Sequence, residues 1–138
     1  MTVDLDRQNG VIVEHLRRAF DDVVAVYRFG STAQGTATSA SDADIAILTR
    51  ERIPPGRRFD VQEALAAAIG SDVDVIDLAS ASPVIAIQVI AGGSLLYDGD
   101  SDARGRFEDL TFGVYARLNE ERRGILERIA TEGTIYGR

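Results

Sequence analysis

Four residues between positions 30 and 44 have types and spacing that could support chemistry on phosphates. Gly30 and Ser31 form one pair, and Asp42 and Asp44 form a second pair after ten intervening residues. Side chains two positions apart in a strand point to the same face, so the two carboxylates are expected side by side. Like charges this close favour a bound cation, and Mg²⁺ prefers such hard oxygen ligands. The Gly30–Ser31 turn adds backbone N–H groups and a hydroxyl, which are suited to binding phosphate.

Each pair taken alone is more often an ordinary surface feature than a functional one. Asp-x-Asp on an exposed strand and Gly-Ser in a turn are both common without any chemistry. The flanking sequence makes the combination more specific, because an apolar run lies on each side of it. Val23 to Phe29 predicts a first strand, and Asp42 to Leu48 predicts a second strand that opens with the two carboxylates.

The chemistry suggested by this pair needs a third carboxylate, and Asp74 is the preferred candidate. It lies in the predicted third strand, Asp72 to Leu78, where alternation places it on the same face as Asp72 and Ile76. A solvated charge on a sheet face is the structural alternative for Asp74. Asp77 is the rival candidate, although alternation places it on the opposite face.

The remaining segments predict helices and one short strand. The expected helices cover residues 5–20, about 57–69 after a Pro-Pro-Gly loop at 50–58, a segment from Ser82-Pro83 through 84–91, and about 101–130. A short strand is expected at 94–97. The segment 84–91 is apolar nearly all round, which predicts a buried core helix, with a protein interface as the alternative. Gly113 and Gly124 weaken the last helix, so a break near Asn119 would not be surprising.

The composition predicts one acidic domain. The chain has 138 residues and a net charge of −7, and all 15 of its basic residues are arginine. One compact domain covering residues 1–138 is expected. An acidic chain without a basic cluster argues against a dedicated nucleic-acid-binding surface. The absence of cysteine excludes disulfides, thiolate nucleophiles and cysteine zinc sites. The acidic, polar N-terminus is unlike a signal peptide, and no apolar run approaches the roughly 20 residues of a membrane span, so a cytoplasmic protein is expected.

The pattern GSx10DxD resembles the signature of the nucleotidyltransferase superfamily related to DNA polymerase beta. The stretch FGSTAQGTATSASDADIAIL is similar to the pattern FGSxARGxAxxxSDxDLAVL of its minimal nucleotidyltransferase (MNT) branch. VDVIDL is similar to the third-aspartate strand of that branch, and SPVIAIQVIAGGSLLYD to the helix and turn that follow. The resemblance implies an α+β nucleotidyltransferase fold. In this fold a small mixed sheet of about four strands is flanked by helices, and a long C-terminal helix follows.

The resemblance also assigns roles to individual residues. The three aspartates of the family fall on Asp42, Asp44 and Asp74, which are then the catalytic residues and metal ligands. The positions implied for nucleotide binding are Gly30, Ser31 and Ser41. The chain departs from the pattern at Gln34, where many members carry arginine, and this puts a phosphate or partner contact in doubt.

Members of the MNT branch are typically the antitoxins of HEPN/MNT toxin–antitoxin pairs. The activity that the resemblance implies is transfer of AMP from ATP, with two Mg²⁺ ions, to a tyrosine hydroxyl of the HEPN toxin, a small helical ribonuclease. Three alternatives remain open. The first is a binding antitoxin that masks the toxin with exposed parts of its long C-terminal helix. The second is a nucleotidyltransferase for a small molecule such as an aminoglycoside, although such enzymes usually carry an extra domain. The third is an RNA acceptor, which the net charge of −7 disfavours.

Overall fold

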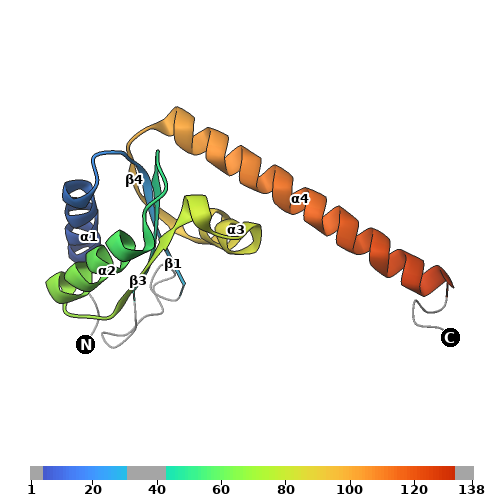
Figure 1. Cartoon of the computed structure of the whole chain (residues 1–138), viewed down its shortest axis with the longest axis horizontal. Helices are drawn as coiled ribbons and strands as arrows, with labels where there is room; N and C mark the ends of the chain where they lie inside the picture. Colours follow the sequence, from blue (N-terminus) through green and yellow to red (C-terminus); the bar gives the residue numbers. More distant parts are fainter. Residues whose placement is uncertain (1–4, 31–42, 133–138) are drawn as a thin grey trace.

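The computed structural model describes residues 5–30 and 43–132 of the chain (Figure 1). The elements are the helices α1 (Leu5–Ala19), α2 (Pro55–Ile69), α3 (Pro83–Gly92) and α4 (Ser101–Glu132), the strands β1 (Val23–Phe29), β2 (Ala43–Thr49), β3 (Val73–Asp77) and β4 (Ser94–Asp98), and the 3₁₀ helix η1 (Leu78–Ser80). The four predicted strands are confirmed, with ends that differ by no more than one residue.

The four strands form a mixed sheet in the order β3-β2-β1-β4. β1 runs antiparallel to both β2 and β4, whereas β2 and β3 are parallel. Parallel neighbours need a crossover connection, and α2 supplies it between the end of β2 and the start of β3. The starts of β2 and β3 therefore lie at the same end of the sheet as the end of β1. This topology confirms the predicted small mixed sheet flanked by helices.

Helices cover both faces of the sheet (Figure 1). Side chains of β2 alternate between the two cores, because successive residues of a strand point to opposite faces. Ile45 and Ile47 are fully buried in a core that includes side chains of α1 and α2. Ala46 and Leu48 are buried in a second core, to which α3 contributes Ala86 and Val89, and α4 packs against it.

The start of the crossover helix and the end of the third strand differ from the sequence prediction. α2 begins at Pro55 rather than near residue 57. Proline is well tolerated there, because the first N–H groups of a helix have no partner within the helix. The helix ends before Gly70 as predicted, and Gly70 adopts a left-handed conformation with φ +72°. Leu78, predicted at the end of the third strand, instead begins η1.

α3 is a surface helix, so the prediction of a buried helix at 84–91 is wrong. Its start is as predicted, since the Ser82 hydroxyl accepts a hydrogen bond from the N–H of Ile85 at 3.3 Å. Only Ala86 and Val89 of this helix are buried, whereas Val84 is 51% exposed and Ile85 40% exposed. Apolar composition did not reveal that only one side of the helix meets the sheet.

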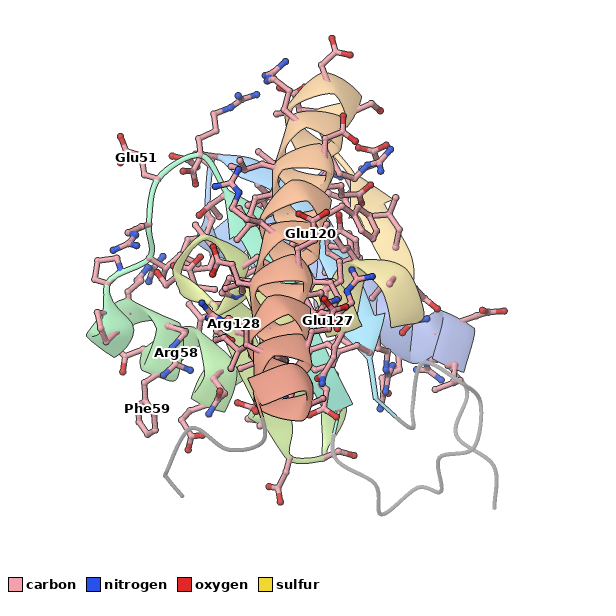
Figure 2. The ribbon with its side chains drawn as sticks, turned by 90° about the vertical axis from the view of Figure 1, so that its right-hand side faces the viewer. Glu51, Arg58, Phe59, Glu120, Glu127 and Arg128 are labelled. Atoms are coloured by element: carbon pink, nitrogen blue, oxygen red, sulfur yellow. The ribbon has the colours of Figure 1, made fainter. Side chains whose placement is uncertain are left out.

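α4 is one continuous helix of 32 residues, and no break occurs near Asn119. Its first part packs on the sheet through Phe107, and Thr111 is buried beside it. Its second part extends away from the rest of the described chain (Figure 1). Figure 2, viewed from that side, shows Glu120, Glu127 and Arg128 along the extended part.

The extended part of α4 carries large apolar side chains as well as charged ones. Leu118 is 42% exposed, Ile125 44% and Leu126 59%. Within the described residues, no helix is both long enough and apolar enough to cross a membrane.

Candidate functional site

The parallel pairing of β2 and β3 places two of the predicted carboxylates in register. Asp44 and Asp74 are Cα partners, as are the preceding residues Ala43 and Val73. The N–H of Ala43 donates to the carbonyl of Asp72 at 2.9 Å, which fixes this register at the start of both strands. Residues in register on neighbouring strands point to the same face, so the two carboxylates adjoin each other. Asp44 is half-buried and Asp74 is exposed.

Gly30 brings the end of β1 against the same pair. Its φ is +78°, a left-handed conformation that side chains disfavour. A Cβ atom at this position would overlap the Oδ2 atom of Asp44. The carboxylate therefore lies directly against the backbone of residue 30, in space that only glycine leaves open. The structure thus brings together three of the predicted site residues, Gly30, Asp44 and Asp74.

The other predicted site residues lie outside the described ranges. These are Ser31, Ser41 and Asp42, together with Gln34, where the sequence departs from the family pattern. Among residues 5–30 and 43–132, no group of three or more histidine, cysteine, aspartate or glutamate side chains is arranged to hold a metal ion. Asp44 and Asp74 nevertheless offer adjoining carboxylate oxygens, the donor type that Mg²⁺ takes from proteins. The donor chemistry of this pair therefore fits Mg²⁺.

Asp77, the rival for the third carboxylate, has a structural role. It is only 6% exposed and lies on the face opposite to Asp74, as alternation predicts. Its carboxylate accepts hydrogen bonds from the Ile53 N–H at 3.1 Å, the Ala79 N–H at 3.2 Å and the Ser80 hydroxyl at 3.0 Å. These bonds cap η1 and attach the loop before α2 to the end of β3.

Arg28 is a charged neighbour of the site that the sequence interpretation missed. It is 2% exposed and is supported from α1, since its guanidinium donates to Asn9 Oδ1 at 2.7 Å and to Gln8 Oε1 at 2.6 Å. Burial lowers the pKa of Arg28, and the charge of Asp44 opposes that decrease. A buried positive charge therefore lies close enough to interact with the carboxylate of Asp44. The signal in the sequence was an arginine within the otherwise apolar run VVAVYRF.

Two hollows adjoin the carboxylate pair, and α3 contributes to the lining of both. The hollow beside Asp44 is bounded by Phe29 and Gly30 on the sheet and by Ile87 and Gln88 on α3. The hollow beside Asp74 follows the free edge of β3, and Ile53, Pro55, Arg58, Ser80 and Ile85 are among its lining residues. Each carboxylate therefore faces its own recess.

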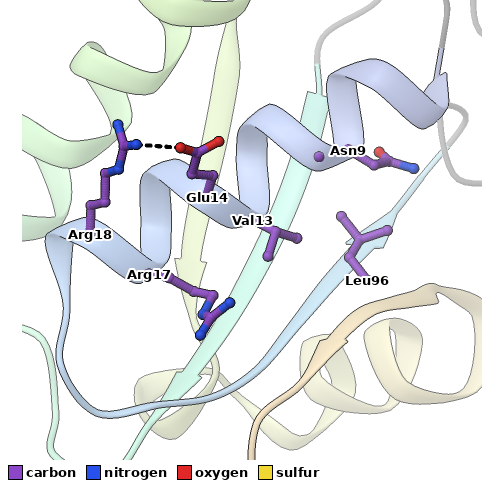
Figure 3. Close-up of a pocket in the computed structure, with 7 residues that line it drawn as sticks. Asn9, Val13, Glu14, Arg17, Arg18 and Leu96 are labelled. Atoms are coloured by element: carbon purple, nitrogen blue, oxygen red, sulfur yellow. Dashed lines mark hydrogen bonds and ion pairs between the residues drawn. The ribbon is translucent and has the colours of Figure 1, made fainter.

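A further hollow lies between α1 and β4 (Figure 3). It is lined by Asn9, Gly10, Val13, Glu14, Arg17, Arg18 and Leu96. Glu14 and Arg18 form an ion pair across one helical turn, and the Arg17 guanidinium lies 4.6 Å from the centre of the Tyr97 ring. Its lining contains neither carboxylate of the pair, so this hollow is separate from the site.

Comparison with known proteins agrees with the fold. A family model described as polymerase beta, nucleotidyltransferase, matches residues 12–102. The chain is 36% identical over 118 residues to the protein adenylyltransferase MntA of Shewanella oneidensis, a match that covers 86% of this chain and 84% of that protein.

Two solved structures have the same fold over most of the chain. One is a toxin–antitoxin with AMP-PNP, with a TM-score of 0.78 and 34% identity, covering 88% of this chain and 98% of the other. The second is the complex of the tri-AMPylated Shewanella oneidensis HEPN toxin with its MNT antitoxin. Its TM-score is 0.76 at 30% identity, and the match covers 91% of this chain and 98% of the other.

Proposed function

Because this chain belongs to the polymerase beta-type nucleotidyltransferase family, we propose that it is a protein adenylyltransferase antitoxin. The reaction is transfer of AMP from Mg-ATP to a hydroxyl, that of a tyrosine, on a cognate HEPN toxin, which is thereby neutralised. Residues 1–138 act as a single nucleotidyltransferase domain. The similarity to MntA and to the complex with a tri-AMPylated toxin supports this acceptor.

The observation that carries the proposal is the in-register pair of Asp44 and Asp74 beside Gly30. Together with Asp42, which precedes Asp44 by two positions, these residues are assigned as the catalytic carboxylates. They would hold two Mg²⁺ ions. The bound metal would neutralise the triphosphate and lower the pKa of the acceptor hydroxyl.

The remaining roles are binding of the nucleotide and deprotonation of the acceptor hydroxyl. The Gly30 backbone and the Ser31 hydroxyl hold the β and γ phosphates, and Ser41 adds a nucleotide contact. Asp74 takes the proton of the acceptor hydroxyl. The hydroxyl oxygen forms a bond to the α-phosphorus, the bond from that phosphorus to the bridging oxygen breaks, and pyrophosphate leaves. The product is an AMP ester of the toxin.

The intact mass of the toxin after incubation with this protein and Mg-ATP tests the proposal. Wild-type protein is expected to add one or more AMP-sized increments to the toxin. The variants Asp42→Asn, Asp44→Asn and Asp74→Asn are expected to add none, because each removes a carboxylate from the site. Asp60→Asn, a change at an exposed position of α2, serves as the matched control and is expected to behave as wild type. Unchanged toxin masses with all proteins would exclude protein adenylylation.

Neutralisation by complex formation is the second candidate function, and the extended part of α4 favours it. The exposed Leu118, Ile125 and Leu126 of this segment are the type of side chain that a protein partner covers. Growth of cells that express the toxin separates the two functions. An antitoxin that acts by binding alone would still protect the cells when Asp42 and Asp44 are replaced by asparagine.

A further inference from the structure

A nucleotide whose phosphates bind at the carboxylate pair would extend into the hollow beside Asp44. It has a volume of about 570 Å³, which lies within the range of small-molecule sites. The sheet side of this hollow consists of Phe29, Gly30 and Asp44, and the α3 side includes Ile87 and Gln88. A carboxylate that would hold the phosphate-bound metal thus shares one recess with an aromatic ring and an amide.

Gln88 is the one polar side chain of α3, whose sequence is PVIAIQVIAG. It is exposed, and it lines the hollow beside Asp44 rather than the one beside Asp74. A glutamine amide offers one acceptor oxygen and two donor hydrogens. The same pairing of donor and acceptor lets glutamine bind the adenine edge, where an amino group stands next to a ring nitrogen.

The second recess has different contents. The hollow beside Asp74 has the side chains of Ile53, Pro55 and Ile85 in its lining, together with those of Arg58 and Ser80. Asp74 is the residue proposed to take the acceptor's proton, so the acceptor hydroxyl is placed at the hollow beside Asp74. The base is therefore assigned to the hollow beside Asp44. Only the ribose lies between the base and the α-phosphate, so the base site must adjoin the phosphate site.

We infer that the hollow between β1 and α3 is the purine site of the nucleotide. In this arrangement Phe29 provides an apolar wall for the base, and Gln88 recognises adenine. The Gln88 Oε1 atom accepts from the 6-amino group, and the Nε2 atom donates to the neighbouring ring nitrogen. This inference rests on the proposed function and adds to it a residue that selects the nucleobase.

Binding of two triphosphates in the presence of Mg²⁺ tests the assignment. ATP is compared by calorimetry with purine riboside triphosphate, which lacks only the 6-amino group. The wild-type protein is expected to bind ATP about fivefold more tightly, because one hydrogen bond to a neutral partner is lost with the analogue. Gln88→Ala is expected to bind the two triphosphates equally. Val84→Ala, an exposed position one turn earlier on the same helix, is expected to keep the wild-type preference.

The outcomes separate this inference from the proposed function. If wild-type protein binds ATP and Gln88→Ala keeps the preference for the amino group, the assignment of Gln88 is wrong and the nucleotidyltransferase proposal stands. Equal binding of both triphosphates by the wild-type protein would also overturn it. If the wild-type protein binds neither triphosphate, the proposed function fails and the inference fails with it.

Discussion

At the scale of single residues, the position of Asp44 depends on the absence of a side chain at Gly30. The left-handed backbone of Gly30 and the contact with the Asp44 carboxylate are two separate requirements for glycine. The sequence predicts that the backbone of Gly30 binds phosphate. The structure adds that this residue also makes room for a carboxylate.

We expect Gly30→Ala to lower the rate of AMP transfer at least tenfold, because the new methyl group would displace the Asp44 carboxylate. The strained backbone would also lower the free energy of unfolding by about 1–2 kcal/mol. Gly70→Ala is the matched control. Gly70 has φ +72° with no atom within 4 Å of an added Cβ, so it carries the same strain without touching the site. Transfer rates and urea unfolding of both variants check this, and equal activity of the two variants would contradict it.

The choice between Asp74 and Asp77 as the third carboxylate shows which properties of a residue can be predicted from the sequence. Alternation along the strand correctly placed the two carboxylates on opposite faces. It did not reveal the three hydrogen bonds that Asp77 accepts, because two of the donors lie in η1 and the third, Ile53, lies in a distant loop. Gln88 and Arg28 were missed for the same reason, since only tertiary packing brings them beside Asp44.

At the scale of elements, β3 carries the proposed catalytic carboxylate on one face and a structural carboxylate on the other, and substitution separates the two roles. Asp77→Asn is expected to lower the free energy of unfolding by about 1–3 kcal/mol, because it weakens hydrogen bonds to buried donors. Its AMP transfer per folded molecule should remain near wild type. Asp74→Asn should show the reverse, with normal stability and no transfer. Chemical denaturation and the toxin mass assay measure the two quantities, and loss of transfer in folded Asp77→Asn would contradict these roles.

The free edge of β3 is held by side chains of the crossover helix. The N–H of Val75 donates to Gln62 Oε1 at 2.8 Å, and the carbonyl of Val75 accepts from Arg58 at 2.9 Å. An edge strand without such partners can pair with another chain. α2 therefore positions β3 from both directions, as the covalent crossover and as the cover of its outer edge.

The elements that were easiest to predict from the sequence are those whose apolar residues are buried along their whole length. β1 and β2 were predicted correctly because their apolar residues pack into the two cores. α3 was predicted as buried because its composition does not record which neighbours cover it. The expected weakness near Asn119 did not break α4, since each glycine costs a helix only about 1 kcal/mol.

At the scale of the whole molecule, a polar network fixes the direction in which α4 leaves the sheet. The Tyr27 hydroxyl on β1 donates to Glu108 of α4 at 2.6 Å. Arg104 bonds to Glu108 at 3.1 Å and to Asp98 of β4 at 3.1 Å. The helix is therefore attached to both β1 and β4 near its start, and its extended part has a defined direction relative to the site.

The same network makes the free energy of unfolding depend on pH in the alkaline range. Burial, and then the hydrogen bond to Glu108, raise the pKa of Tyr27 above its ordinary value near 10. Stability from this group is complete below pH 10. It decreases above pH 10 by about 1.4 kcal/mol per pH unit, because the unfolded state loses the proton first. The chain contains no lysine or cysteine, so tyrosines are the side chains whose ordinary pKa lies in this window.

We expect Tyr27→Phe to reduce the decrease in unfolding free energy between pH 10 and pH 11.5. Below pH 9 the variant should be less stable than wild type, because the bond to Glu108 is lost. Urea unfolding at a series of pH values measures both effects. Identical pH slopes for variant and wild type would show that Tyr27 does not titrate differently on folding.

The register between β2 and β3 also determines which insertions and deletions this chain can tolerate. Residues added to the turn before β3 would lengthen a loop and leave Asp44 opposite Asp74. Removal of one residue from β3 would shift the residues on one side of the deletion to the opposite face, so that either Asp74 would turn toward the α1–α2 side or the neighbouring valines would leave their core. Among descendants of this gene, length differences are therefore expected in the turns that flank the strands, and the spacing within β3 should stay constant.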